Sequence, residues 1–274
     1  MMTIKNILCL SLTYAVSNSA VACINSYAFD MGAGAITQEY AEEKLEETKA
    51  KIKTVEELND YGVLLIFAHR NNDAIKIFKQ LEKQHPNLAK TAANLGTAYE
   101  LSGDLEKAKY WIEQGMQRDA NIHQGSEWIH LKILDAQIQQ KKDSKWIQTH
   151  DVLGLDFGTS TVPKAKVQEI VFQNKHYDLD KILLDSEIQM DQRLRFVKHD
   201  PISAQIVFNM ANIELTKYNT DDYTVDILYD RAKDLGYSNP QLLEKRKDYF
   251  LHSKWFQIKA FVFQLWQHLK KYFD

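Results

Sequence analysis

Between Thr91 and Met116, apolar side chains recur three or four positions apart, the spacing that places them on one face of an α-helix. The pattern is interrupted at Ser102-Gly103-Asp104, three residues that favour a tight turn. Several recurring positions hold glycine or alanine, which have little or no side chain, so two helices can approach closely there. The stretch therefore predicts two short amphipathic helices that pack through Ala92, Leu95, Gly96, Tyr99, Ala108, Ile112 and Gly115.

The same arrangement is found 34 positions earlier in the chain. The residues that stand where Leu95, Gly96, Tyr99, Ala108 and Ile112 stand in the later copy are Tyr61, Gly62, Leu65, Ala74 and Phe78. The two copies define units of about 55–88 and 89–122. A helix–turn–helix unit that repeats every 34 residues resembles the tetratricopeptide repeat (TPR) family.

The resemblance is carried by particular positions. The two small positions of the family, its aromatic position and its proline are matched by Gly62, Ala74, Phe78 and Pro86. The tryptophan of the family is missing, and Leu58 and Ala92 stand in its place. The resemblance implies a curved array of about three or more helix pairs, because one unit cannot bury its apolar face alone. We therefore predict an all-α fold, a TPR-like α-α superhelical array with a diverged helical C-terminal half.

The pattern divides the chain into six predicted segments. They are a signal peptide (1–22), a tether and acidic capping helix (23–54), TPR-like repeats (55–142), an irregular insertion (143–176), diverged helical repeats (177–252) and a basic amphipathic C-terminal helix (253–274). Within the insertion, Leu153–Thr161 resembles the first phosphate loop of the actin and heat-shock ATPase superfamily. No second phosphate loop follows it, so we do not expect a nucleotide site.

The N-terminus has the features of an export signal. Lys5 precedes the apolar run Ile7–Val16, and Ala20-Val21-Ala22 has the small-x-small form that a signal peptidase requires. Cys23 would then begin the mature chain, where bacterial lipoproteins carry a lipid-modified cysteine, although the leucine usual three residues earlier is missing. We predict an exported protein, in the periplasm or associated with the outer membrane of a Gram-negative bacterium, with lipidation of Cys23 left open.

Composition narrows the classes of function. The chain has 274 residues, of which 45% are hydrophobic and 26% charged, and its net charge of −3 gives no reason to expect nucleic acid as a partner. Only Cys9 and Cys23 could supply thiols, so the mature protein lacks a cysteine pair for a disulfide or a thiolate metal site. We predict no cofactor.

His123, Glu127 and His130 are the candidate chemical cluster, since the spacing i, i+4 and i+7 places them on one helix face. Two histidines and a carboxylate can bind zinc or iron, although this is not the HExxH arrangement of metallopeptidases. The alternative is that Glu127 and His130 line a groove. The TPR resemblance implies that a partner contacts the inner helices, for which the candidates are Asn94, Tyr99, Trp128, Glu127 and His130.

The C-terminal stretch Trp255–Phe273 combines an apolar stripe with lysines, and two interpretations stay open. It packs on the array as an end helix, or it contacts a membrane surface. The sequence shows no Ser-His-Asp arrangement, nucleotide fingerprint or paired carboxylates, so a non-enzymatic scaffold that binds a protein or peptide is the favoured function. The alternatives are a metal-dependent enzyme or metal-binding protein that uses the histidine cluster, and a membrane-tethered structural component of envelope assembly.

Overall fold

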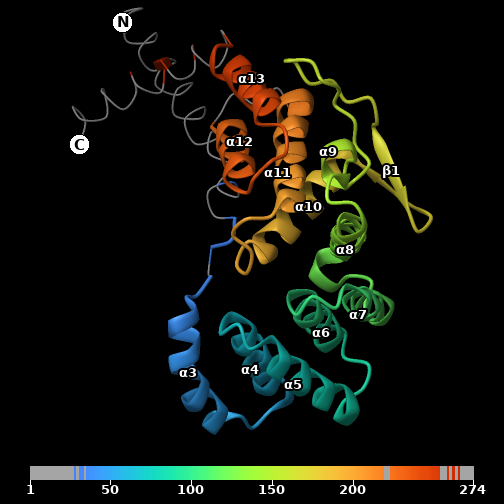
Figure 1. Ribbon diagram of the computed structural model, residues 1–274, viewed down its shortest axis with the longest axis vertical. Helices are drawn as coiled ribbons and strands as arrows, with labels where there is room; N and C mark the ends of the chain where they lie inside the picture. Colours follow the sequence, from blue (N-terminus) through green and yellow to red (C-terminus); the bar gives the residue numbers. More distant parts are fainter. Residues whose placement is uncertain are drawn as a thin grey trace, which may run out of the picture.

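Helices account for most of the described chain, which confirms the prediction of a mostly helical protein (Figure 1). The computed structural model describes residues 28, 31–33, 35–218 and 223–253, together with residues 258, 261, 262 and 265. The predicted signal peptide and Cys23 lie outside these residues.

The elements of the first half are α3 (Gln38–Lys51), α4 (Val55–Phe67), α5 (Asn71–Gln84), α6 (Ala89–Leu101), α7 (Leu105–Arg118), the 3-10 turn η1 (Ile122–Gly125), α8 (Glu127–Lys142) and α9 (Trp146–Thr149). The second half contains β1 (Glu169–Phe172), β2 (Lys175–Asp178), α10 (Leu179–Arg193), α11 (Pro201–Ile213), the π-helical turn η2 (Glu214–Tyr218), α12 (Thr224–Asp234) and α13 (Pro240–Leu251). We call α3–α7 the first lobe, and α9–α13 with the β-hairpin the second lobe.

The first lobe keeps the period of the sequence. Helices α4 and α6 have 13 residues each and begin at 55 and 89, while α5 and α7 have 14 residues each and begin at 71 and 105. The predicted close approaches are present. A Cβ atom on Gly62 would lie 2.5 Å from Cε1 of Phe78, and one on Gly96 would lie 2.6 Å from Cδ1 of Ile112. Glycine is therefore required where each helix pair touches, because no side chain fits.

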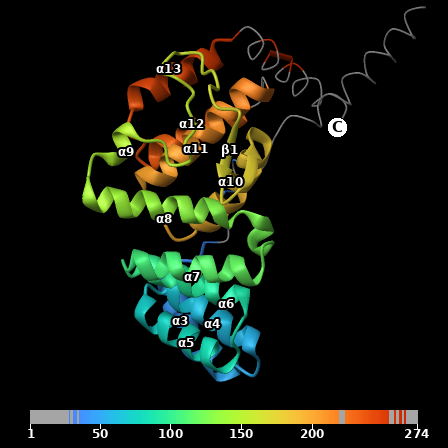
Figure 2. The same ribbon diagram turned by 90° about the vertical axis from the view of Figure 1, so that its right-hand side faces the viewer.

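Helix α8 belongs to both lobes. Its residues Leu131 and Leu134 lie in the apolar core of the first lobe, together with buried side chains of α3–α7. Trp128, Ile129 and Ile133 lie instead in the core of the second lobe, with side chains of α10–α13. Figure 2 shows α8 lying between the two lobes. The two cores are thus held together by one helix that is buried on two faces.

Two described residues within the predicted tether pack against the second lobe. Ala28 and Met31 are buried in the core of the second lobe. The Gly32 amide donates to Oδ1 of Asp191 at 3.1 Å, and Arg231 donates to the Met31 carbonyl at 3.2 Å. The acidic helix α3 then packs Ala41 and Leu45 into the core of the first lobe. The chain therefore touches the second lobe before it builds the first.

The predicted insertion is more ordered than its sequence suggested. It ends in an antiparallel hairpin in which Glu169 pairs with Asp178 and Phe172 with Lys175. The two turn residues, Gln173 and Asn174, have φ angles of 48° and 60°. This left-handed pair is typical of a two-residue hairpin turn, whose twist matches that of the strands. Helix α10 follows β2 directly, with Asp178 capping its first turn.

Helices α11 and α13 begin with a side-chain cap. Asp200 accepts hydrogen bonds from the amides of Ile202 and Ser203 at the start of α11, and Asn239 accepts one from Leu242 at the start of α13. In both cases proline occupies the first helical position, where no amide hydrogen bond is lost. Over the described part of the chain, no helix combines the length and apolar content that a membrane span requires.

Candidate binding face and its buried charge network

Alternate helices α4, α6 and α8 contact one another through polar side chains. Nδ2 of Asn94 donates to Oδ1 of Asn59 at 3.3 Å, and the Thr91 hydroxyl donates to the same oxygen at 3.5 Å. Nε2 of Gln137 on α8 donates to Oε1 of Glu100 on α6 at 2.8 Å. We call these five residues the polar seam. It runs across three helices that are not adjacent in sequence.

The seam has hydrogen-bonding capacity left over. Nδ2 of Asn59 and Oε1 of Gln137 are buried, and neither has a partner among the described residues. Asn94 beside them is half-buried. A buried polar atom without a partner costs about 1–3 kcal/mol. The seam therefore contains one donor and one acceptor that no described residue uses.

The histidine cluster forms a linear series of hydrogen bonds, from His123 through Glu127 and His130 to Glu100. The two oxygens of Glu127 contact Nδ1 of His123 and Nδ1 of His130, the second at 3.2 Å. Nε2 of His130 lies 2.8 Å from Oε2 of Glu100. Because both ring nitrogens of His130 face carboxylates, both must donate, and the ring is an imidazolium ion.

The pKa values follow from this geometry. Burial alone would lower the pKa of His130, but hydrogen bonds and charge from Glu100 and Glu127 outweigh it and raise the pKa to about 9. Burial likewise opposes the charge on Glu127, yet the two histidines lower its pKa to about 2. The pKa of Glu100 is also lowered, with Arg193 as the strongest favourable neighbour. Glu100, Glu127 and His130 are therefore ions that stabilise one another's charge.

This arrangement does not favour a metal site. The nitrogens of His130 and the oxygens of Glu127 already have partners within the protein. Across the described residues, no group of three or more His, Cys, Asp and Glu side chains is arranged to hold a metal ion. The three residues do lie together, but not on one helix face as predicted. His123 lies in the turn η1 with a φ angle of 46°, whereas α8 begins at Glu127, and the three side chains bind one another.

Arg193 at the end of α10 joins the second lobe to this network. It donates to Glu100 at 2.6 Å and to Asp200 at 2.9 Å. Three residues later, the ring of Phe196 lies 4.4 Å from the ring of Phe67 at the end of α4. The turn that follows α10 thus rests on the same three-helix face as the polar seam.

Two of the predicted groove residues need correction. Trp128 has no exposed surface: Nε1 donates to Asp185 at 2.7 Å, and the ring stacks on Tyr177 at 4.2 Å. Tyr99 is 9% exposed and lies below the ammonium group of Lys107. Both rings are packed against other residues of the protein, so neither offers a surface to a partner. Among the five predicted residues, Asn94 is half-buried and the other four are buried.

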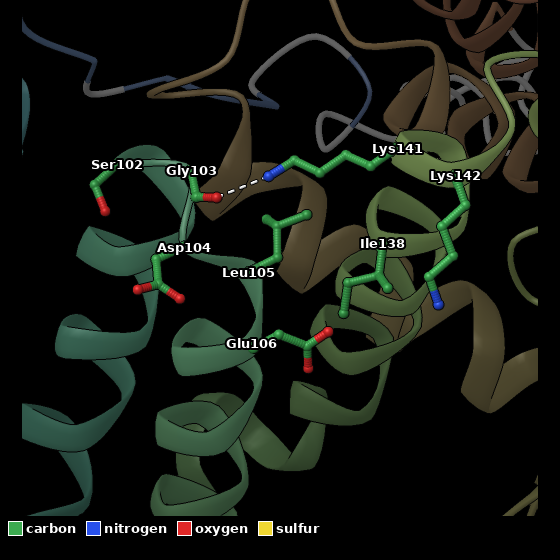
Figure 3. A pocket seen from close by; sticks show the side chains of 8 residues that line it. All are labelled: Ser102, Gly103, Asp104, Leu105, Glu106, Ile138, Lys141 and Lys142. Carbon is green, nitrogen blue, oxygen red and sulfur yellow. Dashed lines mark hydrogen bonds between the residues drawn. The ribbon is translucent and has the colours of Figure 1, made fainter.

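A surface pocket of about 490 Å³ lies between the start of α7 and the end of α8 (Figure 3). Its lining residues are Ser102, Gly103, Asp104, Leu105, Glu106, Ile138, Lys141 and Lys142. Nζ of Lys141 donates to the Gly103 carbonyl at 2.7 Å across one side of it. Two acidic and two basic residues balance in charge, so the pocket has no preference for ligands of one sign.

The segment that resembles a phosphate loop is built the opposite way from an anion cradle. The carbonyls of Phe157, Gly158 and Ser160 converge on the buried guanidinium of Arg246. Phosphate is held by converging N–H groups, whereas these are acceptors that surround a cation. The segment is therefore an anchor that fastens the insertion to α13.

Several residues that shape the face were not predicted from the sequence. Glu100 and Arg193 are separated by 93 positions, and each lies in an ordinary helical pattern. Asn59 and Gln137 look like solvent-facing residues of amphipathic helices. One signal could have found Glu100 and Arg193. A charged residue that stands within the apolar pattern of a helix is expected to be buried, and a buried charge needs a partner.

Comparison with known proteins adds no relative: the chain matches no family model, no curated protein and no solved structure.

Proposed function

We propose that this protein is a non-enzymatic, TPR-like scaffold of the bacterial cell envelope that binds a protein or peptide across the face of α4, α6 and α8. The proposal rests first on the 34-residue period, which the helix lengths and the glycine contacts of the first lobe repeat. Repeat arrays of this kind present a continuous surface formed by alternate helices.

The observation that carries the proposal is the unmatched pair in the polar seam. Nδ2 of Asn59 is a donor and Oε1 of Gln137 an acceptor, both buried and both without a partner among the described residues. An extended peptide laid along the seam supplies complementary groups to both. Its binding would return the cost of about 1–3 kcal/mol for each unpaired group.

The test is to crosslink the exported protein mildly in its host envelope and identify the chain that copurifies in constant ratio. Asn59→Ala and Asn94→Ala should each lower recovery of that chain about tenfold, which corresponds to about 1.4 kcal/mol. Asn72→Ala is the matched control, because Asn72 is an exposed asparagine of α5, away from the seam. Equal recovery with all three variants contradicts the proposal.

The envelope location is tested separately. Fractionation of cells that produce the protein should place it with the periplasm or the outer membrane. Cys23→Ser distinguishes a soluble periplasmic protein from one anchored by a lipid. The substitution moves the protein to the soluble periplasmic fraction only where a lipid on Cys23 is the anchor. Recovery of unprocessed chain from the cytosol contradicts export.

A further inference from the structure

A second surface pocket, of about 310 Å³, lies between the end of α7 and the β-hairpin. It is smaller and more enclosed than the pocket at the end of α8, and its volume lies at the lower end of the range for small-molecule sites. Helix α7 contributes Glu113, Met116 and Gln117 to its walls, and β2 contributes Lys175 and Tyr177. Since α7 belongs to the first lobe and the hairpin to the second, a ligand in this pocket would contact both lobes.

The pocket contains an acidic and a basic side chain that are left unpaired. Glu113 lies on α7 and Lys175 on β2. They form no ion pair with each other, and neither side chain is hydrogen-bonded to another described residue. Lys109, one turn before Glu113, donates instead to Asp135 at 2.6 Å. The pocket therefore presents one negative and one positive charge, from two different elements, to a molecule that enters it.

Each charge has a polar neighbour that suits the same ligand group. Gln117 follows Glu113 by one turn of α7, so the two lie on one helix face. Tyr177 follows Lys175 by two residues on β2, so these two lie on one face of the strand. Tyr177 is 7% exposed, and its hydroxyl forms no hydrogen bond with a described residue. Burial, and then the charge of Asp185, raises the pKa of that hydroxyl, so it stays protonated and can donate to an anion.

The remaining lining is compatible with a small organic ligand. Met116, Ala120 and Gly125 offer a short apolar surface to the body of the molecule. An ion of one sign would meet one favourable and one unfavourable charge. A molecule with an ammonium group at one end and a carboxylate at the other satisfies both charges at once.

We propose that this pocket binds a small zwitterionic molecule of the amino-acid class, with its ammonium group toward Glu113 and Gln117 and its carboxylate toward Lys175 and Tyr177. None of these residues belongs to the polar seam, so the site is separate from the peptide-binding face on α4, α6 and α8. The bound molecule joins α7 to the hairpin and so links the two lobes at a second place, beside α8.

The experiment titrates the full chain with ω-amino acids that contain one to five methylene groups, followed by isothermal titration calorimetry. The length that matches the separation of the two charges should bind best, with a Kd of about 1 mM or below. The amine and the carboxylic acid of the same length should each bind about tenfold more weakly, because each loses one ion pair. The best ligand should also raise Tm, since it binds the folded protein. Equal affinity for the zwitterion and its singly charged analogues, or no saturable binding by any member of the series, overturns the proposal.

Substitutions in the two walls place the ligand. Glu113→Gln and Lys175→Met should each weaken the best ligand about fivefold, and Tyr177→Phe should weaken it by a similar factor while it keeps the buried ring. The matched controls are Glu106→Gln and Lys142→Met, which remove the same two charges from the pocket at the end of α8 and should leave the affinity unchanged. Circular dichroism should be the same for all five variants. Unchanged affinity in Glu113→Gln and Lys175→Met, or equal weakening in the controls, contradicts the proposed site.

Discussion

The two lobes are held together by different means. In the first lobe, consecutive helices pack through small and apolar residues, as where Gly62 meets Phe78 and Gly96 meets Ile112. In the second lobe, buried polar side chains fasten distant backbone: Arg246 reaches carbonyls 86 to 89 positions away. Periodic packing can be altered one contact at a time, whereas a single polar anchor supports a whole segment. Stability should therefore be spread evenly in the first lobe and concentrated in the second.

Arg246→Met should have the largest effect. It removes the printed donor of the Gly158 and Ser160 carbonyls. It also removes one of two donors to the Phe157 carbonyl and to Oδ1 of Asn212, which keep Lys164 and Tyr229. Each buried acceptor that loses its donor costs about 1–3 kcal/mol, so the total loss should be about 3–5 kcal/mol. Urea unfolding followed by tryptophan fluorescence measures the change. Arg70→Met is the control, because Arg70 forms an exposed pair with Asp73. Similar losses in the two variants would mean that the anchor is not special.

The pH dependence of stability should come next in size. His130 has a pKa of about 9 in the folded protein, so its stabilising contribution is complete below about pH 6.5, the pKa of an unperturbed histidine. That contribution is lost as pH rises through 9, which lowers the free energy of unfolding by up to about 3 kcal/mol. Urea unfolding at a series of pH values measures the slope.

His130→Gln should flatten this slope, since glutamine does not titrate. His176→Gln serves as the control, because His176 is exposed and pairs with Glu169 on the hairpin. A slope that survives in the His130 variant would place its origin elsewhere.

Glycine substitutions test the first lobe. Gly96→Ala places a Cβ 2.6 Å from Cδ1 of Ile112 and 3.1 Å from the Ala108 carbonyl, so overpacking should cost about 1–3 kcal/mol. In Gly115→Ala the nearest atom is 3.4 Å away, and the better helix propensity of alanine should make it neutral or stabilising by up to about 1 kcal/mol. Thermal unfolding compares the two. If the clash with Ile112 causes the loss, Ile112→Ala should cost less stability in the Gly96→Ala variant than in the unmodified protein. Equal costs in the two backgrounds would mean that the clash is absent.

Lys141→Met should have the smallest effect. The hydrogen bond from Lys141 to the Gly103 carbonyl is exposed, so its loss should change the free energy of unfolding by about 0.5 kcal/mol or less. Chemical denaturation measures it beside the other variants. A loss as large as that of Gly96→Ala would show that the end of α8 is fixed by this one contact.

Prediction from the sequence succeeded where structure is periodic and local. The paired helices of the first lobe and the turn at Ser102-Gly103-Asp104 were visible in the pattern. It failed where the partner is distant. Trp128 looked like a surface aromatic beside two histidines, yet its partner Asp185 lies 57 positions later. Spacing along one helix does not show what packs against it.

The hairpin at Glu169–Asp178 was missed for another reason. Its strands have four residues each, and the turn uses Gln173-Asn174 with no glycine. Asparagine adopts the left-handed region more readily than most residues, so Asn174 was the one available signal. The site was only partly predictable in the same way: Asn94 and the histidine cluster were found, but Glu100, Arg193 and Asn59 were not.

The position of α8 has a consequence for engineering. A repeat pair is commonly regarded as a portable module that can be cut out and grafted. Here a fragment that ends at residue 142 would expose Trp128, Ile129 and Ile133, which the intact protein buries in its second core. A fragment that begins after α8 would lose one wall of its own interior. Each lobe completes the other, so the chain should denature in one cooperative step, and the backbone amides of α8 should be among the last to exchange with heavy water.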